Sequence, residues 1–85
     1  MIVAYDVNVE RVAKVNKFLK RFLHWRQNSV FEGELTMSQI EKVKEGIMEI
    51  IDSAEDCVTI YILPSKKYMK EVTLGIKKSD TEMIL

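Results

Sequence analysis

The apolar residues of this chain fall into short blocks whose spacing changes along the sequence. Residues 1–6 and 57–63 are apolar at nearly every position and show no helical spacing. Such continuous runs are typical of strands that are buried on both faces of a sheet. Residues 72–76 instead alternate apolar with polar or small residues, which predicts a half-buried strand at the edge of a sheet.

Two other segments have the spacing of amphipathic helices. Residues 9–23 carry one apolar stripe, and Asn8 precedes it as a candidate N-cap. Residues 36–52 carry a second, and Thr36 and Gln39 have the spacing of a capping box. The two stripes are formed by Val12, Val15, Leu19 and Phe22 in the first helix, and by Ile40, Val43, Ile47 and Ile50 or Ile51 in the second.

The remaining segments complete a mixed fold. β-Branched and aromatic residues predict a strand over residues 25–32, a turn follows at 64–67, and an apolar end predicts a short last strand at 82–85. We therefore expect one α+β domain over residues 1–85, a ferredoxin-like βαββαβ sandwich with an extra C-terminal strand.

This arrangement predicts a partner for the sheet. Right-handed crossovers place both helices on one face, yet the strands at 1–6 and 57–63 are apolar on both faces. A face-to-face homodimer would cover the second face, and we expect the tail, residues 79–85, to pair across it. The alternative is a monomer with an exposed apolar face, which is uncommon when the patch exceeds a few hundred Å².

Size and composition exclude several classes of protein. A chain of 85 residues is short for one domain, and its single cysteine, Cys57, cannot form an intramolecular disulfide or a multi-cysteine metal site. No apolar stretch approaches the ~20 residues that span a bilayer, and the start of the chain lacks a basic leader. We expect a cytoplasmic protein without a membrane partner.

The net charge is zero, but the charges are segregated. Residues 1–31 hold six basic residues against two acids, a balance of +4, whereas residues 32–56 hold eight acids against two lysines, a balance of −6. Lys14, Lys17 and Arg21 share the polar side of the first helix, where a phosphate backbone could lie. The alternative is an ordinary solvated helix face.

Asp6 is the first candidate for chemistry, because it ends the first strand where the chain enters a crossover. A carboxylate is a hard oxygen ligand suited to Mg²⁺ or Mn²⁺, although one carboxylate alone binds weakly. If a two-fold axis runs nearby, two Asp6 side chains can hold one ion that activates a water. The alternative is an Asp6 that caps or braces the turn.

Three motifs at set distances strengthen the functional hypothesis. They are Tyr5-Asp6-Val7 at the end of the first strand, the basic helix with Lys14 and Lys17-Phe18-Leu19-Lys20, and Gln-Asn-Ser-Val-Phe-Glu-Gly at residues 27–33 before Leu35-Thr36. Together they strongly resemble the second core CRISPR-associated protein, the small dimeric partner of the spacer integrase. The resemblance covers nearly the whole chain.

The resemblance implies a homodimer that bridges CRISPR spacer integrase subunits while foreign DNA is acquired. It also implies a metal-dependent endonuclease acting on single-stranded RNA or double-stranded DNA, with Asp6 as the catalytic and metal-binding residue. The nucleic acid is then expected along the basic residues Arg11, Lys14, Lys17, Arg21 and Arg26. Two alternatives remain: a non-enzymatic scaffold dimer in which Asp6 is structural, and, from the fold alone, a regulatory module that binds a ligand between subunits.

One position departs from the family pattern. Members often place an arginine two residues before the glutamine of the Gln-Asn-Ser-Val-Phe motif, and here Trp25 stands there. Arg26 follows it, on the other face of the predicted strand. The first helix also uses mainly lysine where the family uses arginine. Lysine binds phosphate as a point charge, so contacts to the backbone are still expected.

Overall fold

The computed structural model describes residues 1–65 and 68–76. The elements are β1 (Ile2–Asp6), α1 (Val9–Leu19), β2 (His24–Gln27), β3 (Val30–Glu32), α2 (Met37–Ile50), β4 (Cys57–Ser65) and β5 (Tyr68–Gly75). This βαββαβ order with one further strand confirms the predicted α+β, ferredoxin-like class. The strand expected at 82–85 and the tail expected to pair across a dimer lie outside the described residues.

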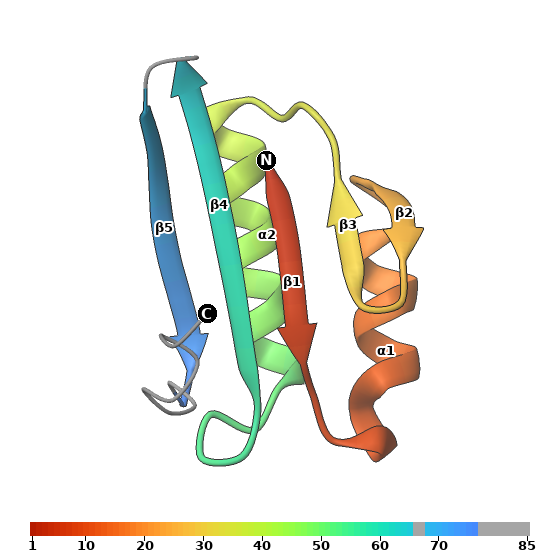
Figure 1. Cartoon of the computed structure of the whole chain (residues 1–85). Helices are drawn as coiled ribbons and strands as arrows, with labels where there is room; N and C mark the ends of the chain where they lie inside the picture. The colour runs from red at the N-terminus through yellow and green to blue at the C-terminus, as the bar shows by residue number, and fades with distance from the viewer. Residues whose placement is uncertain (66–67, 77–85) are drawn as a thin grey trace.

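The strands form one antiparallel sheet in the order β2-β3-β1-β4-β5. β1 lies at its centre, and both helices cover the same face (Figure 1). In the register, Val3 of β1 lies opposite Phe31 of β3 and Ile60 of β4. β5 lies at one edge, as predicted.

The segment predicted as a single strand over residues 25–32 is a hairpin. β2 and β3 pair with each other, and the chain turns between them at Asn28 and Ser29. Asn28 has φ 38°, a left-handed conformation that asparagine tolerates better than most residues. The indole Nε1 of Trp25 donates to the Asn28 carbonyl at 2.9 Å, which closes the turn. The prediction was wrong because it overlooked the turn chemistry of Asn-Ser.

Other boundaries moved by a few residues. α1 ends at Leu19, four residues before the predicted end, and a turn follows in which Phe22 and Leu23 both donate to the Leu19 carbonyl. α2 begins at the predicted capping box, where Gln39 N donates to the Thr36 hydroxyl at 3.2 Å. β4 continues to Ser65, two residues beyond the predicted strand.

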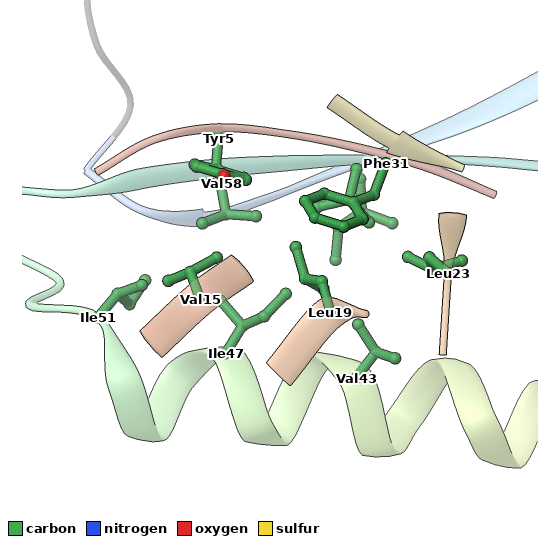
Figure 2. Close-up of a cluster of buried hydrophobic side chains, with 11 residues drawn as sticks. Tyr5, Val15, Leu19, Leu23, Phe31, Val43, Ile47, Ile51 and Val58 are labelled. Carbon is green, nitrogen blue, oxygen red and sulfur yellow. The ribbon is translucent and has the colours of Figure 1, made fainter. Parts of the chain in front are cut away.

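The core fills the space between the sheet and the helices (Figure 2). Fully buried side chains come from every layer: Val3, Val15, Leu19, Phe31, Val43, Ile47, Val58 and Ile60. The two helical stripes predicted from the sequence thus supply the helical half of the core. Neither helix has the length and apolar character needed to cross a membrane, as judged over the residues that the structure describes.

Within residues 1–65 and 68–76, neither helix lies on the second face of the sheet (Figure 1). Side chains alternate between faces along a strand, so the register places half-buried residues here, among them Ile2, Ala4, Val30, Thr59 and Tyr61. The strands at residues 1–6 and 57–63 were predicted to be buried on both faces. Within one chain, they are fully buried only on the face that the helices cover. The uncovered face is what a second copy would have to cover.

Candidate functional site

Asp6 is the last residue of β1 and lies opposite Cys57, the first residue of β4. Its side chain is exposed, and strand alternation puts it on the uncovered face together with Ile2 and Ala4. Beyond Asp6 the chain turns toward α1, where Glu10 N donates to the Asn8 side chain at 3.1 Å. The predicted N-cap at Asn8 is thereby confirmed.

A cavity of about 260 Å³ opens beside Asp6. Three elements meet around it: the end of β1, one side of α1 and the β2–β3 turn. Its lining consists of Tyr5, Asp6, Val7, Val12, Asn16, Asn28 and Ser29. The turn is held to β1 by a backbone hydrogen bond from Tyr5 N to Ser29 O at 3.1 Å. The carboxylate therefore stands next to amide and hydroxyl groups contributed from far along the sequence.

The tyrosine in this lining is fixed by one hydrogen bond. The Tyr5 hydroxyl donates to the Asn16 side-chain oxygen. Burial raises the pKa of the Tyr5 phenol, so the hydroxyl stays protonated and can keep donating at neutral pH. The ring itself is buried and stacks on Phe31 with 6.3 Å between ring centroids. One wall of the cavity is thus continuous with the core.

The donor atoms at this site suit a hard divalent cation. Mg²⁺ is usually bound through one or two carboxylates, with waters and substrate phosphates completing its shell. Asp6 offers one carboxylate, and Asn28 and Ser29 add oxygen-bearing side chains to the same cavity. Over the described ranges, no group of three or more His, Cys, Asp or Glu side chains could hold a metal ion. Among the described residues of one chain, the carboxylate that lines this cavity is that of Asp6.

The predicted nucleic-acid contacts fall into two groups. Lys14, Lys17 and Arg21 are exposed on or just after α1, outside the cavity lining. The other two arginines have acidic neighbours. Arg26 Nε lies 3.5 Å from a Glu32 carboxylate oxygen, and Arg11 is held by Asp56 and Glu55. A role for any of these residues in nucleic-acid binding stays a prediction.

Asp56 is a residue that sequence reasoning missed. Its side chain is fully buried and accepts hydrogen bonds from Asn8 N and Asp52 N, both at 2.8 Å, and from Arg11 Nε at 2.6 Å. The Arg11 guanidinium, more than any other neighbour, holds the pKa of the Asp56 carboxyl far below its usual range. Asp56 thus ties together the start of α1 and the end of α2.

The sequence contained only weak signals for these unforeseen residues. Arg11 and Asp56 are separated by 45 positions, and nothing local distinguishes Asp56 from the other acids of its loop. Asn16 offered a better signal, since it is a polar residue beside the apolar stripe of the first helix. Asn28 and Ser29 lie within the motif that carries the family resemblance, but without an assigned role.

Comparison with known proteins gives consistent matches. The family model described as CRISPR associated protein Cas2 matches residues 1–71. A protein of Thermococcus kodakarensis named CRISPR-associated endoribonuclease Cas2 is 52% identical over 85 residues, which is 100% of this chain and 98% of that protein. A protein of the same name from Pyrococcus furiosus is also 52% identical, with the same coverage of both chains.

A solved structure agrees with these matches. The crystal structure titled as that of Cas2 superposes with a TM-score of 0.72 and is 50% identical in sequence. The match covers 99% of this chain and 94% of the other. The similarity therefore extends over the sheet, both helices and the surroundings of Asp6.

Proposed function

The chain belongs to the Cas2 family of CRISPR-associated proteins, and on this premise we propose that it acts in CRISPR adaptation as a homodimeric, metal-dependent nuclease. Its substrate is RNA or double-stranded DNA, and the dimer also bridges subunits of the spacer integrase in the cytoplasm. The relatives are named endoribonucleases. The observation that carries the proposal is the exposed Asp6 carboxylate beside a cavity lined by amide and hydroxyl groups.

The uncovered sheet face supports the homodimer. It presents a half-buried, largely apolar surface around Ala4 and Thr59, and Asp6 stands at its end. If two copies pack through this face, the interface is isologous, so each residue near the two-fold axis meets its own equivalent. Two Asp6 carboxylates near that axis would complete the donor set that one chain leaves partial. The tail, residues 79–85, is proposed to extend this interface.

The chain's own groups have defined tasks in this proposal. Asp6 would hold Mg²⁺ or Mn²⁺, and the bound ion would supply an activated water and stabilise charge on a phosphoryl oxygen. Asn28 and Ser29, in the turn beside it, orient the phosphodiester by hydrogen bonds. Tyr5 and Asn16 keep the wall of the cavity in place through their own hydrogen bond.

Lys14, Lys17 and Arg21 attract the phosphate backbone without reading its sequence. Arg11 and Arg26 make weaker contacts with the phosphate backbone, because each arginine already faces a carboxylate. Arg11 faces Asp56, and Arg26 faces Glu32.

The proposal is tested by cleavage of labelled single-stranded RNA and duplex DNA with Mg²⁺ or Mn²⁺, and with EDTA. Asp6→Asn should lower the rate at least ~100-fold, because losing even an indirect partner of a metal site often costs 10–100-fold. Light scattering should show a dimer for wild type and variant alike. Glu45→Gln is the matched control, since Glu45 is an exposed acid on α2 outside the cavity lining.

The contrary outcome is equally well defined. If cleavage survives Asp6→Asn, or does not follow the protein peak through purification, the nuclease assignment fails. A dimer that still binds the integrase would then act as a scaffold in which Asp6 is structural. A monomer at micromolar concentration would remove both roles.

A further inference from the structure

Trp25 is a large aromatic side chain left on the surface. It is the single tryptophan of the chain, and 56% of it is exposed. It lies in β2, the edge strand of the hairpin, whose four residues are all exposed. Neither the core nor the metal site proposed at Asp6 uses it.

The indole is nevertheless held in a fixed orientation. Its Nε1 donates to the Asn28 carbonyl at 2.9 Å, so its one polar group is already satisfied. Asn28 lines the cavity beside Asp6. The ring is therefore anchored to the same turn that borders the proposed site, and the residue as a whole is more than half exposed.

The segment that contains Trp25 is basic in sequence. No acid occurs between Glu10 and Glu32, whereas that stretch contains Arg11, Lys14, Lys17, Lys20, Arg21 and Arg26. Lys20 and Arg21 are exposed at the end of α1, shortly before β2 begins. Single-strand binding proteins combine exposed aromatic rings with basic side chains, and this segment contains both kinds of residue.

A second copy on the uncovered face would not hide the ring. Trp25 lies opposite Phe31 in the β2–β3 register, and Phe31 is buried on the helix side of the sheet. Paired residues share a face, so Trp25 also belongs to the helix side. The proposed dimer packs through the opposite face and leaves Trp25 accessible.

We propose that Trp25 is a stacking platform for an unpaired nucleobase of a strand whose backbone runs to the Asp6 cavity. The inference rests on the proposed function and refines its substrate to single-stranded nucleic acid. Stacking on tryptophan accepts any base, because every base has a π-face, so no sequence preference is required. The bases of a duplex are already stacked on their neighbours and cannot use the platform.

The single tryptophan reports on its own contact. Wild-type protein with EDTA, which prevents cleavage, is titrated with a short oligouridylate and with a blunt duplex while tryptophan emission is recorded. We expect saturable quenching by the single strand and little change with the duplex. If anisotropy of a labelled oligouridylate shows binding while tryptophan emission stays constant, the inference is overturned, and the Asp6 assignment is untouched.

Two variants separate stacking from turn anchoring. Trp25→Phe keeps an aromatic face but loses the hydrogen bond to Asn28, whereas Trp25→Ala loses both. By anisotropy, Trp25→Ala should weaken single-strand binding about 5- to 150-fold, the range for loss of one base stack. Trp25→Phe should stay close to wild type, and duplex binding should not change. Equal loss in both variants would assign Trp25 to the turn alone and overturn the inference.

Discussion

Two aspartates at the same end of the sheet have opposite environments. Asp6 ends β1 opposite Cys57, and Asp56 immediately precedes Cys57, so the two are neighbours across adjacent strands. Asp56 is fully buried and accepts hydrogen bonds from two backbone amides and from Arg11. Asp6 is exposed and lines a cavity.

The difference shows how one residue type serves two purposes. A buried carboxylate is tolerable only when its charge is balanced and its oxygens are hydrogen-bonded. Asp56 meets this condition, and its contacts fix where α1 begins and α2 ends. Asp6 lies where a ligand or a second chain can reach it. The contacts of Asp56 stabilise the fold, whereas Asp6 is placed for the chemistry that we propose for it.

The strongest test of this contrast compares alanine at both positions. Asp56→Ala should lower the free energy of unfolding by roughly 3 kcal/mol, the lower end for a broken buried ion pair, because Arg11 keeps its contact with Glu55. Asp6→Ala should lower it by less, because the exposed Asp6 leaves no buried charge unpaired when it is removed. Urea titrations followed by circular dichroism measure both. Similar losses in the two variants would mean that Asp6 also supports the fold.

The next effect concerns the glycine that packs against Asp56. Gly75 has φ 85°, and a Cβ there would collide with the Asp56 carbonyl oxygen. Gly75→Ala should therefore cost roughly 2 kcal/mol, from the left-handed backbone and the displaced neighbour. Gly33→Ala is the matched control, since its added Cβ would meet mainly the end of the Leu23 side chain, at 3.0 Å. If Gly75→Ala melts at the wild-type temperature, the loop around Asp56 is more adaptable than its hydrogen bonds suggest.

Acid should reveal the same buried carboxylate. The Arg11 contact lowers the pKa of Asp56 in the folded protein, so its stabilising contribution is complete above the unfolded pKa, near 4, and is lost as pH falls below it. The slope is at most ~1.4 kcal/mol per pH unit for one group. Wild type should lose stability between about pH 5 and 2 more steeply than Asp56→Asn, which has no carboxyl group to protonate. Parallel curves for the two proteins would assign the acid sensitivity to other carboxylates.

Much of the fold could be predicted because its signals are local. The stripe of Ile40, Val43 and Ile47 and the capping box at Thr36 fix the second helix within a few residues. The hairpin was missed because its strands are only four and three residues long, too short for a period to be recognised. The left-handed backbone conformation of Asn28 depends on the tertiary fold, and the sequence gives only a weak signal for it.

The site was less predictable for the same reason. Asp6 stood out because it ends an apolar strand and belongs to the Tyr5-Asp6-Val7 motif. Asn16 and Ser29 line the same cavity, although they come from other segments of the chain. Asp56 forms an ion pair with Arg11, which is 45 positions away in the sequence. Such long-range polar pairings depend on the tertiary fold, whereas hydrophobic periodicity and helix caps can be recognised from residues that are close in the sequence.

The smallest expected effect concerns the hydrogen bond in the cavity wall. Tyr5→Phe removes the hydroxyl that donates to the Asn16 side chain while keeping the buried ring and its stacking on Phe31. The free energy of unfolding should fall by about 0.5–1.5 kcal/mol, the net value of one such bond. A double-mutant cycle with Asn16→Ala isolates the pair from the rest of the cavity.

The cycle also tests the division between the two aspartates. If Tyr5 and Asn16 serve the cavity, Tyr5→Phe should slow cleavage more than its small loss of stability implies, because the wall that borders Asp6 becomes free to move. The cleavage rates of Tyr5→Phe and Asn16→Ala should then be similar, since each variant breaks the same bond. If the Tyr5→Phe variant cleaves at the wild-type rate but is measurably less stable, this hydrogen bond maintains the fold, as the contacts of Asp56 do, and has no role in cleavage.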